Sequence, residues 1–379
     1  MFKKILSVIT LVLIAVIAYK AFSAPAPGDM EGMTMLEATF ASLNDMNGWV
    51  LLLLIPEQLF MYYAAGKIYF AFLQQRKNFK ISQAKLTRIS LEINFMNHAI
   101  PSGGMSGLAY LVWRLKDYKV TAGQISFIHI LRYGICALAN AAQTVIAIII
   151  ILATGQLLAA EGGVFAIVLA AGIALGVIGI IIVAWLIVRK QKNVDWLSET
   201  ATKFINKVMR KVTRGKKRKF LKEEEVTRFF GDLRADYLQL KSNKKILWKP
   251  VLWGFIYSFL ELATYWVVAT AMGHPEILPQ IMIAEGVGSV VGTVLVTPGG
   301  VGGYEAAFIW VLTATGVPLH VATITVIVTR VCVLLGTIVC GFVPYQMALL
   351  SRPDKFDAKK VEQEIAEENA EAAAKAVKK

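Results

Sequence analysis

The chain has 379 residues, of which 56% are hydrophobic and 17% charged, and its formal net charge is +14. Its three cysteines all fall inside apolar runs and show no CxxC spacing, which excludes a disulfide framework and a cysteine-based metal site. The positive charge is concentrated in segments that border long apolar stretches, which favours a membrane protein over a nucleic-acid-binding one. We expect no metal ion, cofactor or nucleic acid.

Six apolar segments approach or exceed the roughly 20 residues that a helix needs to cross the hydrocarbon core. In chain order they are 5–19, 49–72, 124–153, 163–188, 251–271 and 319–350. The first is short, and together with Met1-Phe-Lys-Lys it also fits a cleavable signal peptide. We expect a retained anchor, because this span gives the two halves of the chain the same number of elements.

Lysine and arginine are distributed unevenly between the segments that join these spans. Neither occurs at 21–66, 133–188 or 251–329, whereas 189–249 holds nineteen bases and seven acids. Basic loops stay on the cytoplasmic side of a membrane. This pattern predicts a multi-pass protein of the cytoplasmic (inner) membrane with both termini in the cytoplasm.

Two semi-polar stretches begin and end on the same side of the membrane by this criterion. The segments that flank 81–112 are both cytoplasmic, and those that flank 280–315 are both outside. Each stretch contains a glycine cluster, Pro101-Ser-Gly-Gly-Met-Ser-Gly or Pro298-Gly-Gly-Val-Gly-Gly-Tyr-Glu. We therefore expect two re-entrant helical hairpins that enter from opposite sides, as in an inverted repeat. The predicted fold class is all-α, a polytopic membrane protein with about six transmembrane helices and these two hairpins.

The predicted organisation has four parts. Residues 1–188 form the first membrane repeat with a linking span, and residues 250–350 form the second repeat. Between them, 189–249 is a basic cytoplasmic loop. Residues 351–379 form a charged cytoplasmic tail with seven bases and seven acids.

Arg132 and Arg330 lie inside apolar spans, about 12 and 16 Å along their helices at 1.5 Å per residue. An unpaired arginine at such a depth costs at least about 2.5 kcal/mol. One interpretation is a salt bridge to Glu92, Glu285 or Glu305 that only pins the two halves together. The interpretation we favour is that the arginines also contact an anionic headgroup, because a guanidinium matches two phosphate oxygens.

Polar residues recur at three- and four-residue spacing around the first arginine and so share one helix face. They are Ser126, His129, Arg132, Tyr133, Cys136, Asn140 and Gln143. This stripe fits the lining of a groove and interhelical hydrogen bonding equally well. Each glycine turn also begins a half-helix, whose free N–H groups and positive dipole end would attract an anion.

The glycine motifs and the arginines that follow them resemble those of a known family. Asn97-His-Ala-Ile-Pro101-Ser-Gly-Gly with Arg132, and Pro298 to Glu305 with Arg330, look like motifs of the transmembrane, flippase-like region of lysylphosphatidylglycerol synthases. The resemblance covers most of 49–350 and implies lipid translocation by a stand-alone member without the synthase domain. The substrate-binding residues that we expect are Asn97, Pro101, Ser102, Gly103, Gly104, Arg132, Pro298, Gly299, Gly300, Gly302, Glu305 and Arg330.

We expect a transporter, and not an enzyme, that moves an anionic phospholipid or a polyprenyl phosphate across the membrane; a homodimer is one possible assembly. The alternatives are a channel and an intramembrane enzyme. Gly104-Met-Ser106-Gly107 fits the Gly-x-Ser-Gly of rhomboid-type serine proteases, with His129 as a base. Pro101-Ser-Gly also resembles a motif of membrane lipid phosphatases.

Overall fold

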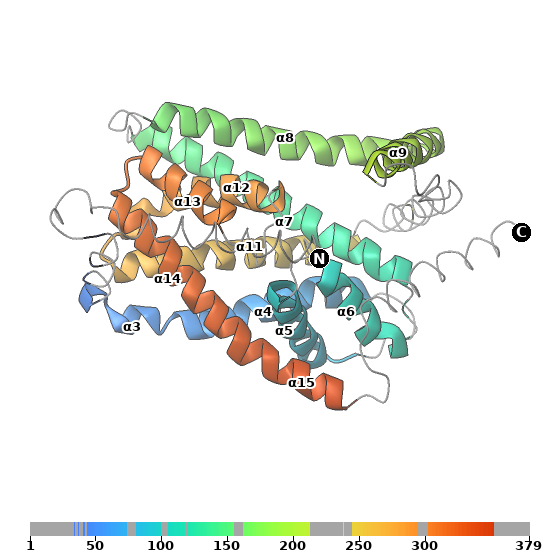
Figure 1. The fold of residues 1–379 in the computed structure, drawn as a ribbon, viewed down its shortest axis with the longest axis horizontal. Coiled ribbons are helices and arrows are strands. Elements are labelled where there is room, and N and C mark those ends of the chain that lie inside the picture. Colours follow the sequence, from blue (N-terminus) through green and yellow to red (C-terminus); the bar gives the residue numbers. More distant parts are fainter. Residues whose placement is uncertain are drawn as a thin grey trace, which may run out of the picture. The chain divides into compact units, whose positions relative to one another are not determined.

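The computed structural model describes residues 44–73, 81–99, 105–118, 120, 122–154, 162–212, 245–294 and 302–351, with the single residues Thr34, Glu37, Ala41 and Leu238. The described chain is built from helices (Figure 1). Their bounds are α3 Gly48–Leu51, α4 Leu54–Leu73, α5 Gln83–Ala99, α6 Met105–Leu115, α7 Ala122–Thr154, α8 Gly163–Arg189, α9 Gln191–Val212, α11 Lys245–Ala271, α12 Leu278–Val294, α13 Gly303–Ala314, α14 Leu319–Thr337 and α15 Val343–Leu350. The all-α fold class is confirmed.

Five stretches of helix are long and apolar enough to cross a membrane. They are Gly48–Leu73, Gln124–Thr154, Gly163–Val183, Leu247–Ala271 and Leu319–Leu350. These stretches coincide within a few residues with five of the six predicted spans. The sixth predicted span, 5–19, lies outside the described residues, as does the predicted tail beyond Ser351.

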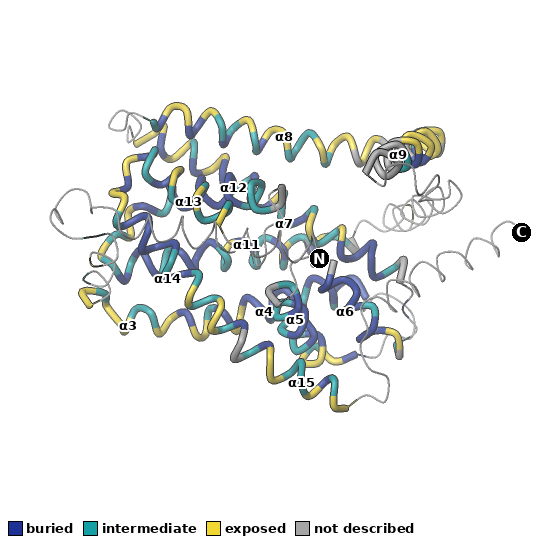
Figure 2. The backbone as a smooth tube through the Cα atoms, viewed as in Figure 1, coloured by how far each residue is buried: buried dark blue, intermediate teal, exposed yellow. Residues whose placement is uncertain are grey.

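The side chains of α8 show why these helices need a bilayer. Phe165, Leu175 and Ile180 on this helix are each about two-thirds exposed, and Figure 2 shows α8 exposed along much of its length. Large apolar side chains that gain nothing from the protein core are stabilised by lipid. A multi-pass membrane protein is therefore the reading that fits both sequence and structure.

Two pairs of short helices lie where the re-entrant hairpins are predicted. Helix α5 packs against α6, and α12 packs against α13. Because α6 and α13 have 11 and 12 residues, they are only about 17 and 18 Å long, too short to cross the hydrocarbon core. The paired helices are thus present at both predicted positions, while the re-entrant course of each hairpin and its entry from opposite sides of the membrane stay predictions.

The chain divides into two compact units. Unit 1 consists of Met1–Met61, Asn140–Ala174 and Ser258–Thr337, and unit 2 of Tyr62–Ala139, Leu175–Tyr257 and Ile338–Lys379. The division falls within α4, α7, α8 and α11, so each of these helices contributes residues to both units. The α5–α6 hairpin belongs to unit 2 and the α12–α13 hairpin to unit 1.

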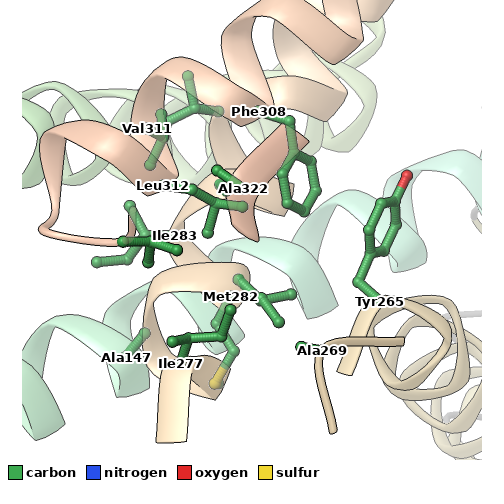
Figure 3. Packing of buried hydrophobic residues seen from close by; sticks show 14 of the residues in the cluster. Ala147, Tyr265, Ala269, Ile277, Met282, Ile283, Phe308, Val311, Leu312 and Ala322 are labelled. Carbon is green, nitrogen blue, oxygen red and sulfur yellow. The ribbon is translucent and has the colours of Figure 1, made fainter. Parts of the chain in front are cut away.

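Each unit is organised around its hairpin. In unit 1, Phe308, Val311 and Leu312 of α13 pack on Ile281 and Ile283 of α12 and are almost fully buried (Figure 3). In unit 2, the corresponding core is formed by buried residues of α4, α5, α6 and α7. Burial of this kind fixes which faces of the hairpin helices point inward and therefore where their polar side chains meet.

Unit 2 also holds an irregular stretch in the last predicted span. Residues Ile338–Phe342 form a π-helical turn, and Pro344 follows at the start of α15. Proline has no N–H to continue the helical ladder, and π-turns often mark functional positions. Gly341 in this turn packs against the backbone of Leu91 and the side chain of Phe95 on α5.

Candidate functional site

In the first hairpin, Asn97 connects the end of α5 to the start of α6. The backbone N–H of Gly107 in α6 donates to Oδ1 of Asn97 on α5, with an N–O distance of 2.9 Å. We expected the free N–H groups of this half-helix to face an anion, but at this N–H a side chain of the same hairpin already accepts. The other predicted residues of this turn, Pro101, Ser102, Gly103 and Gly104, lie outside the described residues.

In the second hairpin, a side chain caps the start of α13. The backbone N–H of Gly302, which precedes α13, donates to Oε2 of Glu305 at 2.7 Å. Gly302 has a φ of 106°, a backbone conformation that glycine adopts at little cost. Here too an intrahelical carboxylate occupies a position that we expected to be open to a ligand. Pro298, Gly299 and Gly300 lie outside the described residues.

Arg330 is held by residues of this second hairpin. Its Nε lies 2.9 Å from Oε1 of Glu305, in an ion pair whose angle is not that of a hydrogen bond. Its guanidinium also stacks 4.0 Å above the ring of Tyr304, whose hydroxyl donates to Glu285. Among the three carboxylates considered from the sequence, Glu305 is therefore the partner of Arg330. A further role of this arginine in lipid binding stays a prediction.

Glu92 pairs with two arginines that the sequence analysis had not considered for it. Its fully buried carboxylate accepts from Arg114 at 2.7 and 3.2 Å, from Arg88 at 3.0 Å and from the hydroxyl of Tyr110 at 3.0 Å. Arg88 also donates to the backbone oxygen of Pro344. Glu92 thus joins α5, α6 and the start of α15, and it is not the partner of Arg132.

Arg132 is surrounded by tyrosines. Its Nη1 donates to the hydroxyl of Tyr69 at 3.1 Å, and its guanidinium lies 5.0 to 5.9 Å from the ring centres of Tyr257, Tyr69 and Tyr133. Its Nε is buried and has no hydrogen-bond acceptor among the described residues, and no described carboxylate forms an ion pair with it. Both arginines have an Nε without a hydrogen-bond acceptor among the described residues, but they differ in charge pairing: Arg330 forms an ion pair with Glu305, whereas Arg132 forms none with a described carboxylate.

A second cation, Lys67, is also surrounded by aromatic rings, and it was not among the predicted site residues. The ammonium of Lys67 lies 5.3 Å from the ring of Tyr63, 5.4 Å from Phe70 and 5.8 Å from Trp253. Trp253 and Tyr257 are four residues apart on α11 and so share a face, which brings the surroundings of Lys67 and Arg132 about one helical turn apart. The sequence did contain a signal for this site, because Lys67 lies inside an apolar span four residues after Tyr63 and so on the same helix face.

The polar stripe on α7 is partly explained by these contacts. The hydroxyl of Tyr69 contacts Nδ1 of His129 at 3.1 Å as well as Arg132, so it joins the two side chains of the stripe. His129 and Tyr133 also make an edge-to-face contact. This part of the stripe forms a hydrogen-bonded network between α4 and α7, whereas Asn140 and Gln143 belong to unit 1.

Ser106, the serine of the protease-like tetrapeptide, lies inside the first hairpin. Its hydroxyl is within hydrogen-bonding distance of the backbone oxygen of Met96, at 3.2 Å, and of Oδ1 of Asn97, at 3.4 Å. The contacts of Ser106 therefore connect α6 to the end of α5, while Nδ1 of His129 is engaged with Tyr69.

A comparison with known protein families matches residues 5–341 to the family described as the lysylphosphatidylglycerol synthase TM region. The chain belongs to this family. Comparisons with curated proteins and with solved structures gave no match. The family match covers the two hairpins and both membrane arginines, so the resemblance inferred from the glycine motifs is confirmed.

The two units offer different chemistry. In unit 2, Arg132 and Lys67 are two cations whose described partners are aromatic rings and a tyrosine hydroxyl. In unit 1, Arg330 is already neutralised by Glu305 and shares its surroundings with Glu285. An anionic ligand would gain more at Arg132, because a buried guanidinium without a carboxylate is stabilised by any phosphate that reaches it.

Proposed function

We propose that the protein moves a phosphate-bearing anionic lipid across the cytoplasmic membrane, with Arg132 as the main contact of the headgroup. The observation that carries the proposal is that Arg132, unlike Arg330, forms no ion pair with a described carboxylate, while its buried Nε has no acceptor among the described residues. A buried donor of this kind is costly unless a ligand satisfies it. Membership of a family of lipid-handling membrane regions supports the same reading.

The aromatic side chains around Arg132 would fix the plane of its guanidinium. Tyr69 accepts from Nη1, and the rings of Tyr257 and Tyr133 limit the side chain's freedom, so that Nε and the remaining N–H groups keep one direction. Two phosphate oxygens match such a fork, and Lys67 would add a second positive charge about one helical turn away. Cation–π contacts hold both cations without neutralising them.

The lipid tails need not enter the protein. They can stay in the bilayer through a lateral opening while the headgroup alone passes along the site. We therefore expect transport to depend strictly on headgroup charge and weakly on acyl-chain length. An anionic phospholipid and a polyprenyl phosphate both meet this description. In this proposal the two hairpins, entering from opposite sides, would expose the site to each leaflet in turn.

The test is a leaflet-specific fluorescence quench in vesicles that contain the purified protein. Labelled phosphatidylglycerol and phosphatidic acid should cross faster than in protein-free vesicles, whereas labelled phosphatidylcholine should not. Two acyl-chain lengths of the same anionic headgroup should cross at similar rates. Equal acceleration of the zwitterionic lipid would rule out the headgroup selection on which the proposal rests.

A further inference from the structure

Unit 1 contains more acidic than basic groups within its helices. Glu57, Glu261 and Glu285 lie on α4, α11 and α12, and Glu305 lies on α13. Arg330 is the one lysine or arginine between residues 258 and 337 of the sequence, and it forms its ion pair with Glu305. Ionised carboxylates are costly at membrane depth unless they are compensated. Glu57 and Glu285 form no ion pair with a described lysine or arginine, and their carboxylates therefore call for protons or cations.

Hydrogen-bond donors surround the carboxylate of Glu57. Nε2 of Gln58 lies 2.9 Å from Oε2 of Glu57 and 3.1 Å from Oγ1 of Thr264. The same Thr264 hydroxyl lies 3.3 Å from Oε1 of Glu57. Glu261 comes three residues before Thr264 on α11 and so lies on the same helix face.

Glu285 extends this group toward the second hairpin. Glu285 is only 3% exposed, and its carboxylate accepts a hydrogen bond from the hydroxyl of Tyr304. The Tyr304 ring contacts Phe308, and Phe308 stacks on Tyr265, which lies four residues after Glu261 on α11. Glu261 thus lies within one helical turn of the α11 residues that connect to Glu57 and to Glu285.

Buried acceptors without donors provide an independent sign that a ligand belongs here. Gln58 is 8% exposed, and its Oε1 has no partner among the described residues, although Nε2 of the same amide is fixed on Glu57. Ser258, fully buried and three residues before Glu261 on α11, also has a hydroxyl without a described partner. Native structures rarely leave such groups unsatisfied, and each of them can accept from an O–H donor.

We propose that Glu57, Glu261 and Glu285 form an exchangeable proton-binding site whose loading and unloading drives lipid movement. A proton from water adds to a carboxylate oxygen, which turns an acceptor into a donor for a neighbouring buried oxygen, and it later returns to water on either side. No other bond forms or breaks. The coupling to lipid movement rests on the proposed function, whereas proton binding itself does not.

A sodium ion fits the same residues less well. Sodium, like other hard cations, needs several oxygen acceptors directed at it. Here Nε2 of Gln58 and the hydroxyl of Tyr304 direct hydrogens at the carboxylates of Glu57 and Glu285. Donors of this kind stabilise a carboxylate in either protonation state but repel a cation placed between them.

Two measurements on the full-length protein separate binding from coupling. In the first, unbuffered detergent solution is acidified from pH 9 to pH 5, and an indicator dye reports the protons taken up per protein molecule. Wild type should take up more protons than Glu261→Gln or Glu285→Gln. Glu276→Gln, in the exposed α11–α12 connection, is the matched control and gives the uptake expected for removal of one ordinary carboxyl. Glu261→Asp keeps a carboxyl group. Proton uptake at the wild-type level in this variant would show that the loss in Glu261→Gln comes from the missing carboxyl and not from misfolding.

In the second measurement, vesicles carry a pH gradient or a sodium gradient across the membrane. The pH gradient should accelerate anionic-lipid movement by wild type and by Glu276→Gln, and this response should be lost in Glu261→Gln and Glu285→Gln. Acceleration by sodium alone would overturn the proton proposal, and so would proton uptake in Glu261→Gln equal to that of Glu276→Gln. Proton uptake by a wild type that moves no lipid would instead leave proton binding standing and contradict the proposed function.

Discussion

Arg114 holds Glu92 with two hydrogen bonds inside the first hairpin, from Nε at 2.7 Å and from Nη2 at 3.2 Å. Breaking a buried pair costs about 3–5 kcal/mol when one charge is left uncompensated, and here Arg88 and Tyr110 still donate to Glu92, so the cost should lie at the lower end of this range. We predict that Arg114→Gln destabilises the protein by this order, measured as the loss of unfolding free energy in detergent. Arg189→Gln, at an exposed arginine at the end of α8, should cost less than about 1 kcal/mol.

The double variant Glu92→Gln/Arg114→Gln tests whether the loss of stability in Arg114→Gln comes from the charge left on Glu92. It removes both members of the pair, so part of the stability lost in Arg114→Gln should return. If Arg114→Gln and Arg189→Gln lose the same unfolding free energy, the ion pair of Glu92 does not stabilise this hairpin.

Gly107 sets how closely the two helices of the first hairpin approach. A Cβ at this position would meet Oδ1 of Asn97 and would lie 2.8 Å from Cγ2 of Ile93. We predict that Gly107→Ala costs about 1–3 kcal/mol of unfolding free energy through overpacking. Gly134→Ala is the matched control, because no atom lies within 4 Å of its Cβ position. That substitution should be neutral or stabilising, since alanine favours a helix over glycine; equal losses in both variants would contradict the close approach.

The hairpins and five spans could be predicted because they depend on local features: apolar length, glycine clusters and the placement of lysine and arginine. The ion-pair partners could not. Glu92 was considered with Arg132 and Arg330, yet it pairs with Arg114, which the charge pattern placed in a cytoplasmic segment. Which carboxylate faces which arginine depends on the rotation and packing of each helix, and one sequence does not encode these in any local pattern.

The aromatic surroundings of Arg132 were missed for a related reason. Tyr69 and Tyr257 lie on helices far apart in the sequence, and their contact with Arg132 appears only when α4, α7 and α11 are packed. The expectation that the N–H groups at the starts of α6 and α13 are open to a ligand was wrong at Gly107 and Gly302 for a different reason. Asn97 and Glu305 were identified as site residues, but their role as acceptors for the N–H groups of Gly107 and Gly302 follows from the turn geometry.

Topology can be tested with single cysteines in a background without Cys136, Cys332 and Cys340. Lys116→Cys, after the first hairpin, should react with an impermeant thiol reagent only from the cytoplasmic side. Glu276→Cys, before the second hairpin, should react only from the outer side, because the charge pattern predicts that the basic segments are cytoplasmic. Mass spectrometry of the labelled protein from right-side-out and inverted vesicles measures this. Labelling of both positions from one side would contradict the inverted repeat.

Ser106 distinguishes transport from serine chemistry. Its hydroxyl is within bonding distance of the backbone oxygen of Met96, so Ser106→Ala should lose about 1 kcal/mol of unfolding free energy or less. Lipid movement in vesicles should stay at the wild-type rate. A complete loss of activity in Ser106→Ala, with the protein still folded and the arginine variants active, would replace transport by nucleophilic catalysis.

The most direct test of the account is lipid movement by Arg132→Lys in the leaflet-quench assay. Lysine keeps the charge and the aromatic contacts but lacks the Nε donor and the two-pronged geometry of a guanidinium. Arg189→Lys is the matched control, since Arg189 also stacks on an aromatic ring, that of Trp185, but in an exposed position. We predict that both variants fold and that Arg132→Lys moves anionic lipid at least about tenfold more slowly, as expected for about 1.4 kcal/mol of lost interaction. Wild-type rates in Arg132→Lys would contradict the claim that this arginine binds the lipid phosphate.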